Sequence, residues 1–409
     1  MNLVIFPRSL IVLLLCLAAP SALAFQENTG GARGDGIADD TAALQSVLNS
    51  GQTVFLGFSK TYRITRRLDI VRDNSGIVGD GTASLLMGVG PGEFDNASKA
   101  KYAANAVGVF ASGVSGARVE GLRIRAERLT ENRVVKAIAL RKCASFRISG
   151  NDMANFSEAN GIVYIGESQH GVISGNDIHD GFINPRSRAQ LSGIVLDDDD
   201  QGSSDIAITG NHIHDLTVGA EFFARFGYQT DGINITVRND HIDVSGNRIE
   251  NVGEAIDSFA TNTTITGNRI AAAHAYGIKF VHGASFSVVS GNVVSDSGIG
   301  GIVLASSPTA ARDTASNVIT GNRVSGVNGD GVYDNHTTFG IGIVLNGSHT
   351  HVTGNRIENN IVDTGGTAMF GILAEKGTGT DNVISGNTVK GWRREAYRLD
   401  PVSVPGGAQ

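Results

Sequence analysis

An apolar phrase that recurs along the chain is interrupted by ionisable residues near its centre. Most copies read like GGIVLA (300–305) and IGIVLN (341–346). The copies between residues 252 and 280 read VGEAIDSF and AYGIKF, so carboxylates, a phenol and an amine stand where other copies carry Ser, Gly or Val. Such side chains exchange protons with substrates in acid–base catalysis. The break in the pattern therefore predicts a proton-transfer site.

Aligning the copies puts the polar residues into two columns across neighbouring strands. Four isoleucines share a position that is expected to point inward, namely Ile233, Ile256, Ile278 and Ile302. The next position points outward and reads Val195, Asn234, Asp257, Lys279 and Val303. The position before the Gly or Ala reads Ser192, Asp231, Glu254, Tyr276 and Gly300. Since adjacent strands lie about 4.8 Å apart, we expect the side chains of Asn234, Asp257 and Lys279 to touch.

One hypothesis is that these residues cleave a uronic-acid-containing polysaccharide by β-elimination, as a polysaccharide lyase. That chemistry needs the uronate charge neutralised, a base for the C5 proton and an acid for the leaving oxygen. The candidates for neutralisation are Lys279, Arg225 or a bound Ca²⁺, the candidate bases are Lys279 and His282, and the candidate acids are Tyr276 and Tyr228. Asp231, Glu254 and Asp257 would orient the lysine or hold calcium, a cation that takes oxygen ligands.

Three alternatives stay open. Asp231 and Glu254 lie on adjacent strands, and their repulsion would raise one pKa and make that carboxyl a proton donor for hydrolysis. Epimerisation would use the same C5 abstraction without cleavage. A non-catalytic glycan-binding module would instead use aromatic side chains to stack on sugar faces. The candidate substrate-binding residues are Phe222, Phe223, Phe226, Tyr228, Arg225, Asn234 and His274.

The whole chain is organised by a second repeat. The tripeptide [Ser/Thr]-Gly-Asn occurs nine times, with its Asn at 151, 176, 211, 247, 268, 292, 322, 355 and 387. Gly and Asn accept the left-handed conformation of a sharp corner, and a unit this short must stack on its neighbours to bury its apolar side. We therefore predict an all-β, single-stranded right-handed parallel β-helix, with the amides of successive Asn residues bonded along its axis.

Insertion lengths predict where a binding groove lies on this β-helix. Short repeat units around residues 255, 277 and 301 are flanked by long insertions. The first wall of the groove would come from 177–192 and 212–231, and the second from 323–341 and 356–370. Loops on a rigid scaffold commonly carry the binding chemistry. The polar columns coincide with the floor of this predicted canyon, whose length suits a polymer chain.

The chain ends have separate roles. Residues 1–24 read as a secretory signal peptide, with an apolar run and a small-residue cleavage site near Ala24, so we expect secretion to the extracellular space or the periplasm. Residues 25–60 are predicted to form an N-terminal cap with a short α-helix within 39–51, residues 61–390 the β-helix, and 391–409 a C-terminal cap. No later segment is apolar enough to span a membrane. A net charge of −7 argues against a nucleic-acid partner, and the sequence leaves the oligomeric state open.

The phrase GARGDGIADDTAALQSVL (31–48) resembles the opening of the pectate-lyase superfamily. This resemblance implies a β-helix that acts on polysaccharides. The run YQTDGINI, VGEAIDSF and AYGIKF is similar to the motif order of polygalacturonase-like hydrolases, with Asp231 and Glu254 at acidic positions and Tyr276 in place of a His. GEAIDS and VHGAS look like motifs of calcium-assisted uronate lyases, with Val281 in place of an Arg.

Two further clusters were considered as metal ligands. The run Asp197, Asp198, Asp199 and Asp200 is interpreted either as a Ca²⁺ site, together with Asp205, or as a solvated acidic turn. His212 and His214 are expected to point to opposite sides and to be exposed near the groove, so no zinc site is predicted. Cys143 is the single cysteine after the signal segment and has no disulfide partner.

Overall fold

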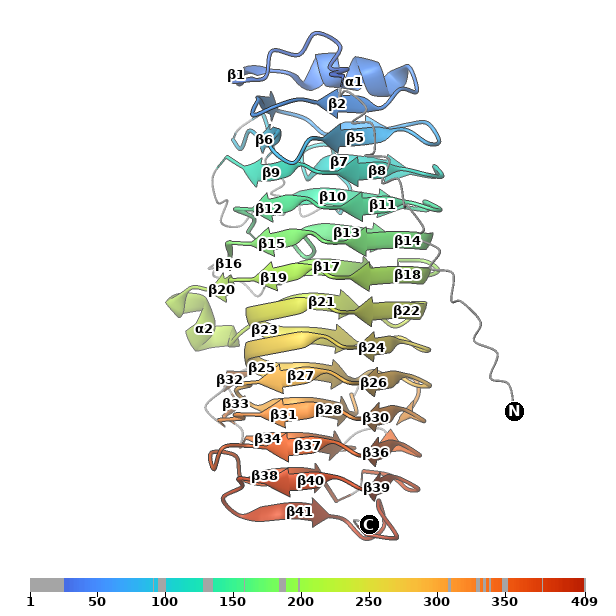
Figure 1. The fold of residues 1–409 in the computed structure, drawn as a ribbon, viewed down its shortest axis with the longest axis vertical. Helices are drawn as coiled ribbons and strands as arrows, with labels where there is room; N and C mark the ends of the chain where they lie inside the picture. Colours follow the sequence, from blue (N-terminus) through green and yellow to red (C-terminus); the bar gives the residue numbers. More distant parts are fainter. Residues whose placement is uncertain are drawn as a thin grey trace, which may run out of the picture.

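The computed structural model describes most of the chain after the predicted signal peptide, which lies outside the described residues. The described ranges are 26–90, 92–94, 101–127, 135–157, 159–183, 189–197, 199–307, 310–328, 332–333, 336–337, 340–347, 352–376 and 378–407. Figure 1 shows one column of stacked coils, with helix α1 (Thr41–Asn49) at one end and strand β41 (Glu395–Leu399) at the other.

Each coil contributes strands to parallel sheets that run the length of the column. One sheet has 12 strands, namely β2 (Val54–Leu56), β5 (Gly76–Gly79), β8 (Arg118–Glu120), β11 (Arg147–Ser149), β14 (Gln169–Ser174), β18 (Ser204–Thr209), β22 (Asp240–Ser245), β24 (Thr264–Thr266), β26 (Val288–Ser290), β30 (Val318–Thr320), β36 (Arg356–Glu358) and β39 (Val383–Ser385). The second sheet has 23 strands and consists of two rows.

The two rows of the second sheet carry different chemistry, so we name them the site row and the histidine row. The site row begins with β4 (Leu68–Ile70) and β7 (Val107–Ser112), and continues with β10 (Lys136–Arg141), β13 (Val163–Gly166), β17 (Leu191–Asp197), β21 (Thr230–Ile235), β28 (Gly300–Ala305), β34 (Ile341–Asn346), β38 (Phe370–Ala374) and β41. The histidine row begins with β1 (Asp35–Asp39) and β3 (Thr61–Ile64), and continues with β6 (Ser84–Met87), β9 (Arg123–Ala126), β12 (Asp152–Ala154), β15 (Asp177–His179), β19 (His212–His214), β27 (Val293–Ser295), β31 (Arg323–Ser325), β37 (Ile361–Asp363) and β40 (Thr388–Lys390). The long strands β23 (Arg248–Ser258) and β25 (Arg269–Phe280) bend through both rows.

Shorter elements decorate the column. They are the pairs β16 (Gly181–Ile183) with β20 (Leu216–Val218), β29 (Thr314–Ala315) with β35 (Val352–Thr353), and β32 (Val332–Tyr333) with β33 (His336–Thr337). Helix α2 (Ala220–Phe226) projects from the column beside β20 (Figure 1). None of the helices among the described residues has the length and apolarity needed to cross a bilayer.

The interior is filled by the inward-facing aliphatic column that the repeat predicts. Ile233 and Ile256 are fully buried, and Ile278 and Ile302 are 1% exposed. The predicted amide ladder is confirmed from Asn151 to Asn322 and at Asn387. The prediction is wrong at Asn355: Asn322 bonds to Asn360 instead, and Asn355 lies in a second ladder between Asn317 and Asn382. Asn268 Nδ2 donates to the Oδ1 atom of Asn292 at 2.9 Å and to the carbonyl of Val244 at 2.9 Å. The preceding glycine of this corner, Gly267, has a φ of +62°, a conformation that glycine adopts without a Cβ penalty.

Both ends of the column are covered. Leu44, Val47 and Leu48 of α1 are buried against the first coils, as the apolar stripe predicts. Asp40 does not cap this helix with its side chain, because its carboxylate accepts hydrogen bonds from the backbone N–H groups of Arg33 and Gly34 at 2.6 and 3.1 Å. At the other end, β41 pairs with β38, so regular strand pairing continues through the segment expected to be a separate C-terminal cap.

Candidate functional site

The predicted register of the polar columns is confirmed by strand pairing in the site row. Asp231 pairs with Glu254, and Glu254 pairs with Tyr276. In the other column Asn234 pairs with Asp257, and Asp257 pairs with Lys279. Strands β21, β23 and β25 therefore place the members of each column side by side. The two columns stand three residues apart on each strand, so alternation alone would not put them on one face. The contacts of Lys279 with both Glu254 and Asp257 show that the two columns nevertheless meet.

Lys279 lies at the centre of this cluster. Its Nζ atom is 2.5 Å from Glu254 Oε2 and 3.1 Å from Asp257 Oδ2. The side chains of Lys279, Glu254 and Asp257 are only 11%, 3% and 6% exposed. Two carboxylates at these distances hold Lys279 as an ammonium ion, because an opposite charge favours the charged form. This arrangement makes Lys279 a poor proton acceptor and a good fixed positive charge.

Asp231 completes the cluster from the neighbouring rung. Its Oδ2 atom accepts hydrogen bonds from Gln190 Nε2, from Ser192 Oγ at 2.9 Å and from Asn234 Nδ2 at 3.4 Å. One carboxylate oxygen each from Asp231, Glu254 and Asp257 lies within 4.8 Å of the others. Three buried acids thus share one ammonium ion among the described residues.

The electrostatics of the cluster favour bound protons. Burial, reinforced by the charge of Glu254, raises the pKa of Asp231 to about 7. Burial raises the pKa of Asp257 well above its ordinary value, although Lys279 opposes the change. Burial and the Glu254 charge also raise the pKa of Tyr276 to about 12. Such displaced pKa values are typical of groups that carry protons in catalysis.

Two carboxylate oxygens of the cluster have no hydrogen-bond partner among the described residues. They are Glu254 Oε1 and Asp257 Oδ1, and both atoms are buried. Leaving a buried polar atom unpaired costs free energy, typically about 1–3 kcal/mol. These two oxygen atoms therefore do not stabilise the fold. Oxygen atoms that bind a proton, an ion or a substrate are expected to be left unpaired in this way.

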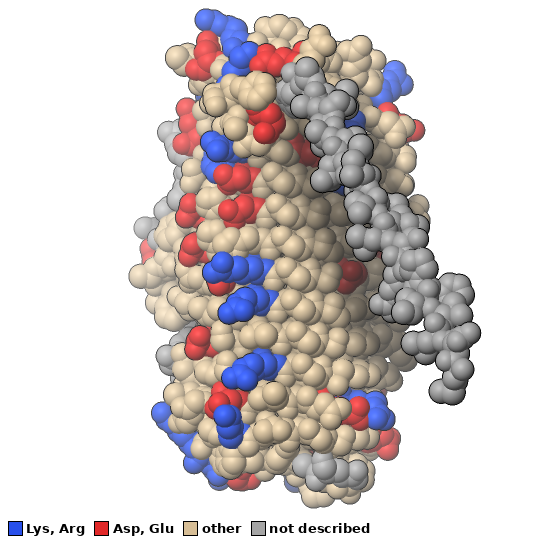
Figure 2. All heavy atoms as spheres, in the orientation of Figure 1, with Lys and Arg blue, Asp and Glu red and all other residues tan. Residues whose placement is uncertain are grey.

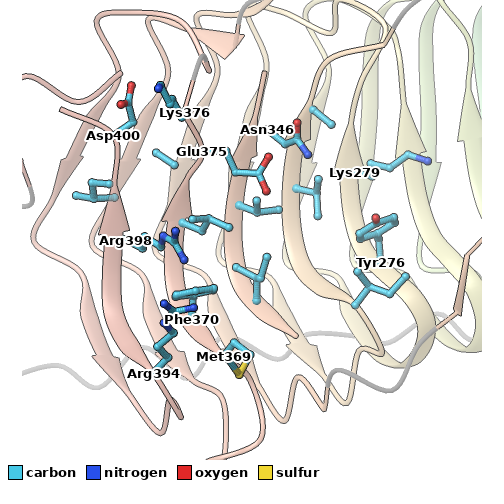
Figure 3. A pocket seen from close by; sticks show the side chains of 18 of the residues that line it. Tyr276, Lys279, Asn346, Met369, Phe370, Glu375, Lys376, Arg394, Arg398 and Asp400 are labelled. Carbon is cyan, nitrogen blue, oxygen red and sulfur yellow. The ribbon is translucent and has the colours of Figure 1, made fainter. Parts of the chain in front are cut away.

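The cluster stands at one end of a groove of about 830 Å³ (Figure 3). Tyr276 and Lys279 line this end, and Arg394, Arg398 and Asp400 lie toward the other. The floor consists of aliphatic and aromatic side chains from β28, β34 and β38, namely Val303, Ile341, Val344, Phe370 and Leu373. The groove therefore runs along the C-terminal half of the site row.

The predicted canyon is wrong in its extent. The described residues of the predicted first wall, within 177–192 and 212–231, are not among those that line this groove, and parts of both predicted walls, within 177–192 and 323–341, lie outside the described residues. The sequence analysis also did not predict the basic residues at the far end of the groove. The outward-facing column Val303, Val344 and Leu373 continues into Arg398 and could have indicated them. The guanidinium of Arg398 lies 5.3 Å from the ring centroid of Phe370.

Most predicted substrate-binding residues from the first wall lie apart from the cluster. Phe222 is fully buried beneath α2 and is not available to stack on a sugar, and Phe226 packs against the core. Tyr228 stacks on His274 with a ring separation of 3.8 Å. Arg225 lies 3.5 Å from Glu221 on the same helix. These residues build the base of α2 instead of the groove.

His282 also stands outside the groove lining. Its ring packs against Phe259, with a centroid separation of 4.5 Å. Burial and the nearby Lys279 charge lower the pKa of His282.

The aspartate run after β17 makes ion pairs. Lys101 Nζ lies 2.6 Å from Asp197 Oδ2 and 2.8 Å from Asp199 Oδ1. Asp200 Oδ2 is 3.5 Å from Arg141, while Asp198 lies outside the described residues. The ammonium of Lys101 thus stands between the carboxylates to which the sequence assigned calcium.

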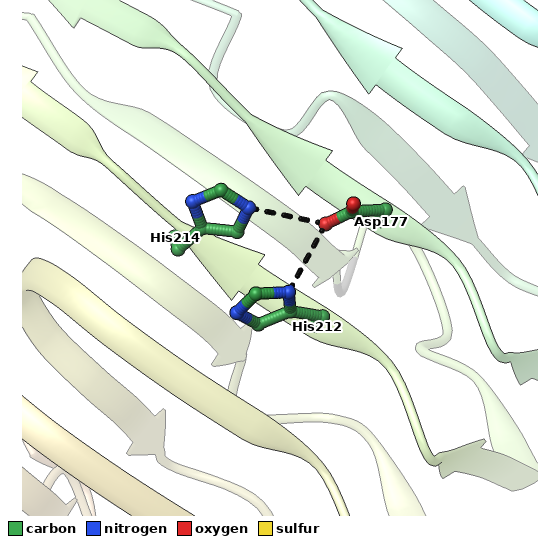
Figure 4. A group of neighbouring side chains, drawn as sticks. All are labelled: Asp177, His212 and His214. Atoms are coloured by element: carbon green, nitrogen blue, oxygen red, sulfur yellow. Dashed lines mark hydrogen bonds and ion pairs between the residues drawn. The ribbon is translucent and has the colours of Figure 1, made fainter.

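The expectation that His212 and His214 point apart is wrong. Their rings stack with centroids 4.1 Å apart, and both approach Asp177 (Figure 4). Residues i and i+2 of a strand share a face, so β19 directs both imidazoles outward while Ile213 points into the core.

Comparisons with known proteins agree on the fold. A family model described as a right-handed beta helix region matches residues 136–312, whereas no curated protein matches the sequence. The A-module of a mannuronan C-5 epimerase from Azotobacter vinelandii aligns with a TM-score of 0.59 and 15% identity, over 93% of this chain and 96% of that chain. The Dettilon tailspike protein aligns with a TM-score of 0.63 and 17% identity, over 93% of this chain and 68% of that chain. The Streptococcus pneumoniae surface adhesin PfbA aligns with a TM-score of 0.58 and 14% identity, over 88% of this chain and 89% of that chain.

These likenesses confirm the right-handed parallel β-helix that the sequence predicts. At identities of 14–17% they show the fold alone. The aligned proteins include an epimerase and an adhesin, so function has to be argued from the site itself.

Proposed function

We propose that this chain is a secreted polysaccharide-acting enzyme that abstracts the C5 proton of a uronic acid unit, with β-elimination as its reaction. The observation that carries the proposal is the buried cluster of three carboxylates and one lysine at the end of an open groove. Its two unpartnered oxygens, Glu254 Oε1 and Asp257 Oδ1, mark it as a site kept for chemistry instead of stability.

Each step of elimination has a candidate group in the cluster. The Lys279 ammonium neutralises the substrate carboxylate and so acidifies the C5 proton. Asp257 takes this proton, because its Oδ1 accepts no other hydrogen bond among the described residues and a carboxylate of raised pKa is a stronger base than an ordinary one. The electron pair forms the C4–C5 double bond as the C4–O4 bond breaks. Tyr276, a neutral phenol at pH 7, gives its proton to O4.

The groove supplies features that suit an anionic sugar chain. Arg394 and Arg398 provide positive charge at the end opposite the cluster, and the apolar floor offers contact area for sugar rings. An aligned epimerase is named for C-5 chemistry on mannuronan. This similarity supports C5 abstraction, and it makes epimerisation the closest variant of the same mechanism.

Hydrolysis is the second candidate, and the pKa of Asp231, which burial raises to about 7, favours it. A carboxyl that holds its proton near pH 7 serves as a general acid. The oxygens lie within 4.8 Å of one another, closer than the roughly 6.5–9.5 Å of an inverting pair. A hydrolase with this geometry would retain the anomeric configuration.

Calcium fits the same residues. Asp231, Glu254 and Asp257 offer the oxygen donors that Ca²⁺ takes, and the unpartnered oxygens of Glu254 and Asp257 are the atoms available to it. A bound calcium ion would supply positive charge toward the uronate in the role given above to Lys279.

The decisive experiment is incubation with a panel of acidic and neutral polysaccharides, with calcium or with a chelator. Ultraviolet absorbance of the new double bond and new reducing ends would be followed together. Both signals should rise on a uronate polymer, and Asp257→Asn and Tyr276→Phe should each lose at least about 100-fold in rate. The matched control Asp363→Asn, which removes an exposed ion pair with Lys390, should retain full activity.

Other outcomes separate the alternatives. Reducing ends without absorbance would replace elimination by hydrolysis. C5 inversion, detected by nuclear magnetic resonance without either signal, would indicate epimerisation. Glycan binding that Asp257→Asn leaves intact, together with no turnover on any polymer, would refute catalysis and favour a binding module. N-terminal sequencing of the exported protein would test secretion with cleavage near Ala24.

A further inference from the structure

A second cluster of ligating side chains lies on the histidine row, on strands β15 and β19. The Oδ1 atom of Asp177 is 3.3 Å from His212 Nδ1 and 3.2 Å from His214 Nε2. Figure 4 shows both imidazoles directed at this one carboxylate oxygen. The three donor atoms lie within 4.8 Å of one another. Two imidazole nitrogens and one carboxylate thus converge without any contribution from the cluster around Lys279.

Two of the three donor separations match tetrahedral coordination. Zinc binds imidazole nitrogen and carboxylate oxygen at about 2.0–2.2 Å, and two donors at that distance with a tetrahedral angle stand about 3.3 Å apart. The Asp177 oxygen already has this separation from both nitrogens, and the two nitrogens lie within 4.8 Å of each other.

The other nitrogen of each imidazole faces a different carboxylate. His214 Nδ1 is 2.7 Å from Asp215 Oδ2, and His212 Nε2 is 3.7 Å from Glu250 Oε2. The Asp215 contact is the usual support of a metal-bound imidazole, because it fixes the ring and increases the basicity of the ligating nitrogen. The Glu250 contact is too long for a hydrogen bond, and His212 Nε2 is buried without a hydrogen-bond partner among the described residues. Asp215 is itself held by Asn251 Nδ2 at 2.6 Å.

The neighbouring His179 makes, one rung earlier, the same two kinds of contact as His214 does, with Nε2 2.8 Å from Asp152 and Nδ1 2.8 Å from Asp180. What distinguishes the rung of His214 is the second imidazole, since His212 stands where the rung of His179 carries Asp177. The ring of His179 stacks on that of His214 with centroids 5.1 Å apart. His179 is therefore a packing partner of His214. With three protein ligands, a metal ion would keep a fourth coordination position open for water or another ligand.

The surroundings make the cluster accessible to a cation. The side chains of Asp177 and His212 are 47% and 34% exposed. Asp152 and Asp177 precede His212 in one column of the row, and Arg248 and Arg269 follow it. Figure 2 shows acidic residues gathered in the upper part of one face and basic residues in a line along its lower part.

We infer that Asp177, His212 and His214 form a binding site for a divalent transition-metal ion of the zinc class. Imidazole nitrogen favours Zn²⁺ and its first-row neighbours over Ca²⁺ or Mg²⁺, which prefer oxygen. The ion would tie β15 to β19. Through Asp215 and Asn251 it would also fix the contact of Asn251 with His274, whose Nε2 lies 2.8 Å from the Asn251 Oδ1 atom.

The test is titration of the tag-free, chelator-treated full chain with Zn²⁺ by calorimetry, and with Co²⁺ by visible spectroscopy. We expect one equivalent of Zn²⁺ bound at micromolar or tighter affinity, and d–d bands of the intensity that tetrahedral Co²⁺ gives. Zinc should also raise the melting temperature in a dose-dependent way. Asp177→Asn and the double variant His212→Ala/His214→Ala should each weaken Zn²⁺ binding at least 100-fold and abolish the cobalt bands.

The matched control is His241→Ala, which removes an exposed histidine 2.6 Å from Asp240 and far in sequence from the three ligands. It should bind Zn²⁺ as the wild type does. Circular dichroism checks that each variant folds, and Asp177→Asn preserves the side-chain shape should the double variant fail. Absence of binding to the wild type, or unchanged binding in a folded Asp177→Asn variant, would overturn the inference.

Discussion

Replacing Lys279 by Met tests whether the Lys279 ammonium ion is needed to keep the carboxyl groups of Glu254 and Asp257 buried. The substitution removes the Nζ atom that lies 2.5 and 3.1 Å from the carboxylates of Glu254 and Asp257, and it leaves an apolar side chain in a site that is 11% exposed. Breaking a buried ion pair by removing one partner leaves an uncompensated charge and typically costs about 3–5 kcal/mol.

The cost is limited because the remaining carboxyl groups can bind a proton instead of staying charged. Protonating one further carboxyl with an ordinary pKa of about 4.3 costs about 4 kcal/mol at pH 7 and about 1 kcal/mol at pH 5. The folded variant then binds more protons than its unfolded form, so its free energy of unfolding falls as the pH rises. Lys279→Met should therefore be destabilised by up to about 4 kcal/mol at pH 7 and by about 1 kcal/mol at pH 5.

Urea unfolding of wild type and variant at the two pH values measures this difference. The control is Lys390→Met. The side chain of Lys390 is 63% exposed and its Nζ atom lies 3.0 Å from Asp363 Oδ2, so this substitution should change stability by less than about 1 kcal/mol at either pH. A loss for Lys279→Met that is the same at pH 5 and pH 7 would refute the electrostatic reasoning, since packing defects do not titrate.

Three further predictions concern the cluster, the groove and the ladder. Asp231→Asn should flatten the pH dependence of stability. The pKa of Asp231 is raised by burial and by Glu254 to about 7, so the stabilising contribution of this carboxyl group is fully present below about pH 4 and is lost as the pH rises through 7. Urea unfolding midpoints from pH 4 to pH 8 measure this dependence. Arg398→Gln should raise KM for an anionic polymer about tenfold, equivalent to about 1.4 kcal/mol, with little change in kcat, whereas the surface control Arg356→Gln should leave both constants unchanged in steady-state assays. Asn268→Ala should lower the free energy of unfolding by about 2–4 kcal/mol because it leaves buried ladder groups unpaired, and Asn387→Ala, at the half-buried end of the ladder, should cost clearly less in the same urea experiment.

The repeat explains why the fold was predictable. Gly and Asn at each corner and alternating aliphatic residues between corners leave stacking as the way to bury the apolar side. Because the side-chain period of a strand is two residues, aligning Ile256 with Ile278 also fixed the register and the outward direction of Asp257 and Lys279. The pairing of these residues confirms that register.

What the sequence by itself determined is therefore the β-helix, its N-terminal helix and the neighbourhood of the polar columns, since these follow from local periodicity. Only the tertiary structure decided that Lys279 sits between Glu254 and Asp257, that the groove runs toward Arg398, and that Phe222 is buried. It also brought Asp177 to the two histidines of the next rung. The physical reason is that loop paths and side-chain rotamers depend on packing between coils, and packing between residues distant in sequence leaves no periodic signal in the chain.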